Sequence, residues 1–179
     1  MGFKIEVMLL AGDQRTTLDA ALRPFGWRTT GRSWPKDEWK TSARDDERAL
    51  VGVNYGRNWT VVHDTDVCFV DEYYQTPDVA RAINADVIIV STYDTVGLQT
   101  FSYATPAGLR RQVEYNEGEL HVDEGEPLFG CRREGEDDDA APFPEADVER
   151  MLSHVLGFDH VEIVMPDDYQ IVEIERVPD

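Results

Sequence analysis

The sequence predicts an α+β fold: a single domain, mainly an antiparallel sheet arranged as a meander, with two to four helices packed on it. Most apolar runs are short, rich in β-branched and aromatic residues, and bounded by turn residues, which is typical of strands. Only a few segments repeat apolar residues at the helical spacing of three and four. At 179 residues, the chain is long enough for one domain with a sizeable core.

The N-terminal part of the chain predicts one strand followed by one short helix. Residues 3–10 form the apolar run of the first strand. The spacing i, i+3, i+4, i+7 then defines one apolar helix face: Leu18, Ala21, Leu22 and Phe25. We expect this helix to end at Gly26.

Residues 27–48 are expected to be an insertion rich in tryptophan and arginine. Three of the four tryptophans lie here, namely Trp27, Trp34 and Trp39. Basic residues recur at every fourth position: Arg28, Arg32, Lys36, Lys40, Arg44 and Arg48. Gly31 and Pro35 argue against one continuous helix. We therefore expect a solvated loop and helix whose tryptophans pack onto the core.

The middle of the chain predicts strands joined by short turns, with one helix among them. Residues 49–54 and 59–63 form a predicted hairpin, and residues 77–83 a helix with Pro77 in its first turn. Residues 87–93 are a continuous β-branched run, typical of a central strand covered on both faces. The meander is predicted over three further strands: 98–104, 109–115 and 119–122. Alternation in the second of these places Leu109, Val113 and Tyr115 on one face and Arg110, Gln112 and Glu114 on the other.

The C-terminal part predicts a loop, a helix and two strands. Residues 123–142 are polar and lack periodicity, which predicts an acidic, mobile loop. Residues 144–156 carry one apolar stripe at helical spacing and predict the clearest helix of the chain. Residues 160–165 and 169–177 predict the last two strands.

The net charge of −19 is unevenly distributed along the chain. Residues 117–179 hold 20 acidic and 4 basic residues, whereas residues 1–116 hold 16 acidic and 13 basic ones. We expect no nucleic-acid binding, because phosphate backbones repel an acidic domain. A concentrated acidic surface instead favours a basic protein partner, since complementary charge speeds and orients encounter. Halophilic adaptation, pairing with the basic residues of 27–48, and mimicry of DNA are alternative explanations.

The binding surface is expected where the acidic excess is densest, between residues 117 and 149. Its candidate residues are Glu117, Glu119, Asp123, Glu124, Glu126, Glu134, Glu136, Asp137, Asp138 and Asp139. Trp34 and Trp39 are secondary candidates. We expect no cofactor, because the acidic run does not match the ligand spacing of a calcium loop and no phosphate-binding glycine loop fits.

His63, Asp64 and Asp66 come closest to a catalytic or metal-binding pattern. A histidine and carboxylates at a strand end can ligate a divalent metal, or pair a base with its orienting carboxylate. One alternative function is therefore a metal-dependent hydrolase that uses these residues; a DNA mimic and a purely structural domain are the other two. No further ligand is indicated nearby in sequence, so a polar turn is the simpler interpretation, with neither a metal nor a catalytic residue.

A cytoplasmic location without membrane contact is expected. The longest clean apolar stretch, residues 87–90, is far shorter than a membrane span, and the N-terminal residues lack the apolar region of a signal peptide. Cys68 and Cys131 have no metal or redox spacing, so we expect free thiols in a reducing compartment.

Four segments carry a resemblance to known proteins. They are Trp59-Thr-Val-Val-His-Asp, Val87-Ile-Ile-Val-Ser-Thr-Tyr-Asp-Thr-Val-Gly, Leu109-Arg-Arg-Gln-Val-Glu-Tyr-Asn-Glu-Gly-Glu and Glu124-Gly-Glu-Pro-Leu. Over residues 59–128, this pattern resembles small acidic bacterial proteins of the immunity-protein type. The resemblance implies a non-enzymatic α+β domain with an inhibitor role, and the acidic charge suggests a basic, nuclease-like toxin as the partner. It assigns no catalytic or binding residue.

Overall fold

The computed structural model describes residues 4–34, 47–64, 69–93, 97–126, 128, 151–156 and 169–178. Its strands are β1 (Lys4–Ala11), β2 (Trp27–Trp34), β3 (Arg48–Tyr55), β4 (Trp59–His63), β5 (Val87–Tyr93), β6 (Leu98–Thr105), β7 (Gly108–Asn116), β8 (Glu119–Gly125) and β9 (Gln170–Arg176). Its helices are α1 (Leu18–Leu22), the 3₁₀ helices η1 (Arg23–Phe25) and η3 (Val70–Gln75), and α2 (Thr76–Ile83). Residues 151–156 are also helical.

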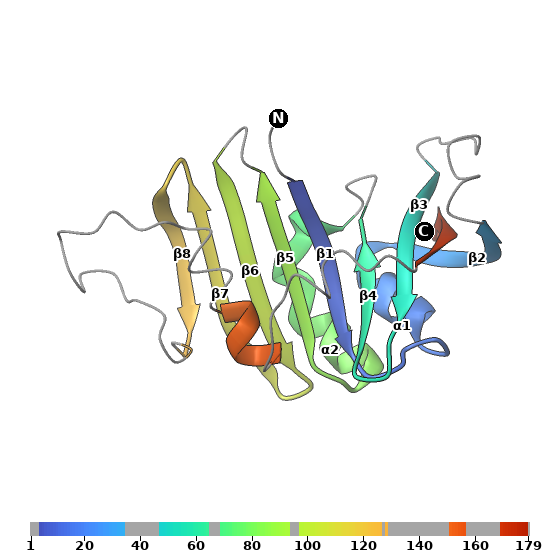
Figure 1. The fold of residues 1–179 in the computed structure, drawn as a ribbon, viewed down its shortest axis with the longest axis horizontal. Coiled ribbons are helices and arrows are strands. Elements are labelled where there is room, and N and C mark those ends of the chain that lie inside the picture. The colour runs from blue at the N-terminus through green and yellow to red at the C-terminus, as the bar shows by residue number, and fades with distance from the viewer. Residues whose placement is uncertain are drawn as a thin grey trace.

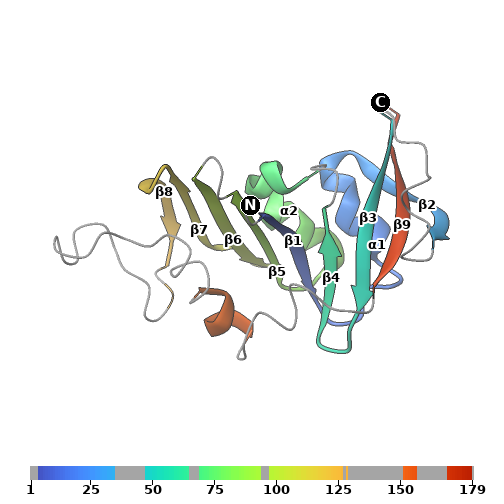
Figure 2. The same cartoon turned by 45° about the horizontal axis from the view of Figure 1, so that its top comes forward.

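The nine strands form one sheet in the order β2-β9-β3-β4-β1-β5-β6-β7-β8 (Figure 1). Every pair of neighbours is antiparallel. From β5 to β8 the strands follow one another as a meander, as the sequence predicts. β2 and β8 are the outermost of the described strands, and Figure 2 shows them at opposite ends of a twisted sheet.

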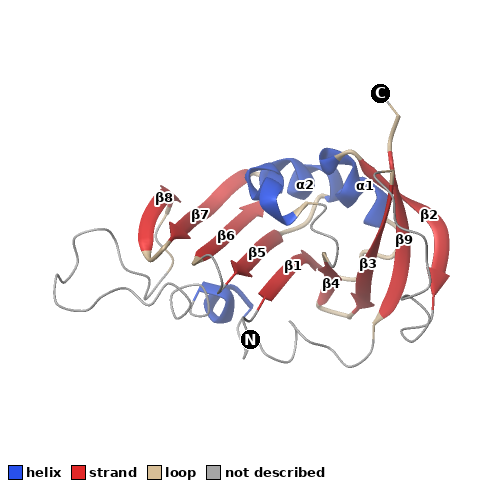
Figure 3. Ribbon diagram, turned by 90° about the horizontal axis from the view of Figure 1, so that it is seen from above, coloured by secondary structure: helices blue, strands red, loops and turns tan. Residues whose placement is uncertain are grey.

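Helices cover both faces of the sheet. α1 and α2 pack on one face and the helical residues 151–156 on the other, as Figure 3 shows. Side chains alternate accordingly: Met8 of β1 joins the core under α1 and α2, and Val7 joins the core with Met151.

The predicted central strand is confirmed. In β5, Val87 and Ile89 face α1 and α2, whereas Ile88 and Val90 face the helical residues 151–156. Both faces are buried, which explains why the strand is an unbroken β-branched run instead of an alternating one.

The other elements predicted within the described ranges are largely confirmed. The first helix is α1 continued by η1, and it ends at Gly26, whose φ of 76° suits a glycine at a helix C-terminus. The predicted hairpin is β3–β4, and the predicted helix over 77–83 is α2, with Pro77 in its first turn. The last predicted strand is β9.

Residues 27–34 correct the expectation of a loop and helix. They form β2, which pairs with β9, and Trp27 is buried in the core. The strand tolerates Gly31 because the glycine lies within a bulge between Thr29 and Ser33, with a φ of 77°. Two strands close in sequence, β2 and β3, are thus separated in the sheet by the C-terminal strand β9.

Three predicted elements fall wholly or partly outside the described residues. The predicted loop over 123–142 begins instead as strand, because β8 continues to Gly125, and most of its remainder is not described. Of the predicted helix over 144–156, residues 151–156 are described and helical. The predicted strand over 160–165 lies outside the described ranges.

Candidate functional site

The two outer strands of the sheet carry opposite charges. β2 has the sequence WRTTGRSW, with two arginines and no acidic residue. β8 has the sequence ELHVDEG, with three acidic residues and neither lysine nor arginine. The described surface therefore offers two candidate sites, one at each end of the sheet.

At the β8 end, the hairpin turn and the strand present a series of carboxylates. Glu117 occupies the β7–β8 turn with a φ of 51°, beside Gly118. The exposed acidic residues here are Glu117, Glu119, Asp123, Glu124 and Glu126. The structure thus gathers the first five of the predicted binding residues on one hairpin and the residue that follows it. Glu134, Glu136, Asp137, Asp138 and Asp139 lie outside the described residues.

Two arginines of β7 neutralise two of these carboxylates. The guanidinium of Arg111 is only 3% exposed, and its Nη1 donates to Asp123 Oδ1 and, at 3.2 Å, to the carbonyl oxygen of Glu124. Arg110 Nη2 donates to Glu126 Oε2 at 2.9 Å, but both side chains are well exposed. Such an exposed ion pair contributes little to stability.

Three carboxylates remain without a cationic partner among the described residues: Glu117, Glu119 and Glu124. We call β8 with these three side chains the acidic edge. The negative charge of these three carboxylates is not compensated by any described neighbour, so it can act on an approaching molecule.

A row of buried polar side chains crosses the sheet beneath η3, next to the acidic edge. Glu6, Ser91, Thr100 and Glu114 hold successive register positions on β1, β5, β6 and β7. Ser91 Oγ lies 2.9 Å from Thr100 Oγ1, and both residues are almost completely buried. The face of β7 that the sequence predicts to be polar is thus partly covered by η3. The sequence did not indicate this cover, because residues 70–75 carry no clear helical pattern.

Tyrosines cap the two carboxylates of this row. Tyr93 OH donates to Glu6 and Tyr73 OH donates to Glu114. Burial, reinforced by the hydrogen bond and the charge of Glu114, raises the pKa of Tyr73. The hydroxyls of Ser91 and Thr100 are sealed from solvent, so the row satisfies buried polar groups and exposes no nucleophile.

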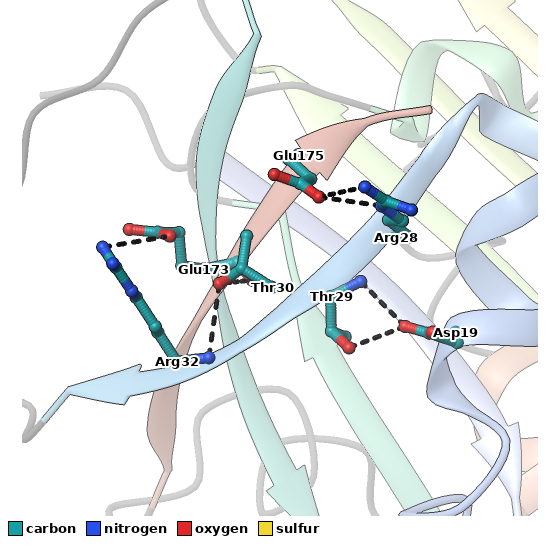
Figure 4. A network of polar contacts seen from close by, with 7 residues as sticks. All are labelled: Asp19, Arg28, Thr29, Thr30, Arg32, Glu173 and Glu175. Atoms are coloured by element: carbon teal, nitrogen blue, oxygen red, sulfur yellow. Dashed lines mark hydrogen bonds and ion pairs between the residues drawn. The ribbon is translucent and has the colours of Figure 1, made fainter. Parts of the chain in front are cut away.

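At the β2 end, the bulge forms a cavity of about 460 Å³. We call it the bulge cavity. All of the described residues that line it are charged or polar: Asp19, Arg28, Thr29, Thr30, Arg32, Arg48, Glu173 and Glu175. Figure 4 shows how α1, β2 and β9 bring most of them together. Arg28, Arg32 and Arg48 belong to the basic pattern seen in the sequence, whereas Asp19 and Thr29 had no sequence signal.

The polar contacts around the bulge cavity join segments far apart in the chain. Arg28 Nε and Nη2 both approach Glu175 Oε1, at 2.8 and 2.6 Å. Asp19 Oδ1 accepts hydrogen bonds from Thr29 N at 2.8 Å and Thr29 Oγ1 at 2.6 Å. The pairing of the basic segment with acidic residues of the C-terminal strand supports the expectation that part of the charge is compensated internally.

Of the possible metal site, the structure describes His63 and Asp64, and their side chains point in different directions. His63 lies opposite Val7 and Gly52 in the sheet, and its ring is 5.8 Å from that of Tyr169. Asp64 is buried on the other face, where its Oδ2 accepts a 2.7 Å hydrogen bond from Phe69 N. Burial lowers the pKa of His63, which favours its neutral form.

Of the remaining candidates of the sequence, the structure describes only Trp34. Asp66 and Trp39 lie outside the described ranges, and Trp34 is half-buried at the end of β2. Among the residues that the structure describes, no group of three or more His, Cys, Asp or Glu side chains is placed to hold a metal ion.

Comparison with known proteins gives no family for this chain: no family model, no curated protein and no solved structure matches it. In the described part of the chain, none of the helices has the length and apolar character needed to cross a membrane.

Proposed function

We propose that this chain is a non-enzymatic protein-binding domain whose acidic edge contacts a basic partner. The observation that carries the proposal is the set of three exposed carboxylates on β8 and its turn, Glu117, Glu119 and Glu124, without a described cationic neighbour. Charge of this kind speeds and orients the encounter with a basic surface more than it adds affinity.

The position of these carboxylates at the end of the sheet supports the proposal. β8 pairs with β7 on one side, and no other described strand pairs with its second side. An outer strand can accept an added strand through its backbone N–H and C=O groups, and its charged side chains oppose pairing with uncharged or acidic segments. An extended partner segment rich in lysine or arginine could pair with β8 and would also be attracted by its carboxylates.

A basic, nuclease-like toxin is one class of partner that fits, and the domain would then act as its immunity protein or inhibitor. Such a toxin carries positive charge where it holds nucleic acid. If the acidic edge covered that charge, nucleic acid could not bind there, because both would compete for the same basic side chains of the toxin.

The test is capture of binding proteins from the source cells with two matched variants of the full chain. One variant replaces Glu117, Glu119 and Glu124 with Gln. The control replaces Asp13, Asp71 and Asp78 with Asn, which removes the same charge from exposed positions outside β7 and β8. We expect the wild type and the control to retain a basic partner at about 0.1 M salt and the edge variant to lose it. Equal retention by all three proteins would refute the role of the acidic edge.

A further inference from the structure

The bulge cavity lies at the opposite end of the sheet from the acidic edge and does not depend on it. Its volume of about 460 Å³ lies within the range of small-molecule sites, about 300–1,000 Å³. None of the described residues that line it has an apolar side chain. A molecule that fits it must therefore be strongly polar.

The cavity contains arginines that its own carboxylates do not saturate. Arg28 is engaged by Glu175, but Arg32 reaches Glu173 only at 4.0 Å and its side chain is 66% exposed. Arg48 is exposed, and no described carboxylate pairs with it. Two guanidinium groups, those of Arg32 and Arg48, thus remain available for an acidic group, which arginine binds well because its N–H donors are arranged as a fork.

The cavity also contains a carboxylate that lacks close partners. The side chain of Glu173 is only 7% exposed, and the 4.0 Å approach of Arg32 is its one ion pair among the described residues. None of the described residues donates a hydrogen bond to its oxygens; Thr30 Oγ1 donates instead to the backbone carbonyl of Glu173, at 3.4 Å. A buried carboxylate with so little compensation is strongly stabilised by a cationic group that can donate hydrogen bonds to it.

Together these groups define the charge of the ligand. The described lining residues include three arginines and three carboxylates, so their formal charge is balanced. A simple anion would meet Glu173, and a simple cation would meet Arg32 and Arg48. A molecule with one positive and one negative group satisfies both sets.

We infer that the bulge cavity binds a small zwitterion of the α-amino acid class. Its ammonium group is held by Glu173 and its carboxylate by Arg32 and Arg48. The neighbouring cavity, which shares Asp19, Thr29 and Arg32 and also includes Leu18 and Tyr55, offers space for the side chain.

Calorimetric titration of the full chain with each of the standard α-amino acids tests this inference. We expect at least one of them to bind. Its analogues that lack either the amino or the carboxyl group should bind at least about tenfold more weakly, because each loses a hydrogen bond to a charged group. Failure of every amino acid to bind would overturn the inference. So would equally tight binding of either analogue, which would indicate a simple cation or anion site.

Two variants locate the binding on the molecule. Arg48→Gln, at an exposed position, should fold normally and weaken binding by about tenfold or more. Arg81→Gln is the control, because Arg81 lies on α2, lines neither cavity and has a side chain that is 56% exposed, and the affinity of this variant should stay within about twofold of wild type. Unchanged binding by Arg48→Gln, with its melting temperature preserved, would contradict the assignment.

Discussion

The two ends of the sheet use charge in different ways. At β2, arginines of the edge strand meet carboxylates of β9, and the lining of the bulge cavity is electrically balanced. At β8, the acidic edge faces solvent and its three carboxylates have no described cationic partner. Total charge along the sequence therefore does not identify a binding surface. Pairing in the folded structure decides which charges remain free to act on a partner.

The two outer strands also differ in how they are anchored. β2 is held to β9, which comes from the far end of the chain, and is interrupted by a bulge. β8 is joined to β7 by a tight turn, and the buried Arg111 links the two strands through Asp123. The stability of each edge should therefore respond to different substitutions.

The largest expected effect is at Arg111. Arg111→Ala should lower the free energy of unfolding by about 3 kcal/mol, because it removes a side chain that is only 3% exposed, together with its packing and its hydrogen bonds to Asp123 and to the carbonyl oxygen of Glu124. Arg110→Ala is the matched control on the same strand and should cost at most about 0.5 kcal/mol, since its pair with Glu126 is exposed. Urea unfolding of both variants measures the difference. Similar losses in the two variants would show that Arg111 does not anchor β8.

Glycine substitutions provide the next contrast between the two edges. Gly125→Ala would place a Cβ 2.3 Å from the carbonyl oxygen of Arg110 at a φ of 87°. Gly31→Ala also requires a positive φ, 77°, but its Cβ would meet no atom within 4 Å. We expect a loss of about 1 kcal/mol for Gly31→Ala and at least twice that for Gly125→Ala, measured by chemical unfolding. A larger loss at Gly31 would mean that the bulge in β2 is the less tolerant edge.

A smaller effect should appear when the pH is lowered. Burial lowers the pKa of His63, so the unfolded chain takes up a proton more readily than the folded one below about pH 6.5. The stability that neutral His63 contributes should therefore be fully present above this pH and be lost as the pH drops. We expect the melting temperature to fall by a few degrees between about pH 7 and about pH 5.5.

Two histidine variants test whether His63 on β4 or His121 on β8 is responsible for that pH dependence. His63→Phe keeps an aromatic ring beside Tyr169 and should flatten the curve in this range. His121→Gln, on the exposed surface of β8, should leave the slope as in the wild type. An unchanged slope in His63→Phe would show that His63 is not the responsible group.

Local patterns predicted most strands and helices of the described ranges, but not their spatial order. The apolar run of β5 shows a strand buried on both faces, and the periodicity of residues 18–25 shows α1 and η1. No local signal indicates that β9 lies between β2 and β3, because β9 pairs with residues that precede it by 137 to 149 positions in β2 and by 117 to 127 positions in β3. β2 was wrongly expected to be loop and helix because its apolar residues are few and Gly31 interrupts them.

The candidate sites were predictable only in part. The excess of acidic residues from Glu117 onward pointed to the acidic edge, although the compensation of Asp123 by Arg111 could not be read from composition. The basic residues in 27–48 recur at every fourth position, but Gly31 and Pro35 argue against one continuous helix that would align them. In the structure, Arg28, Arg32 and Arg48 instead converge from two strands that are not neighbours in the sheet.

The central claim is that free negative charge is concentrated at the acidic edge and not at β2. Its most direct test is a residue-resolved NMR titration of the labelled full chain with an oligo-arginine peptide at low salt. We expect amide shifts concentrated in residues 117–126, suppressed at about 0.5 M salt where exposed charges are screened. Shifts of equal size in residues 27–34, or none in residues 117–126, would contradict the account.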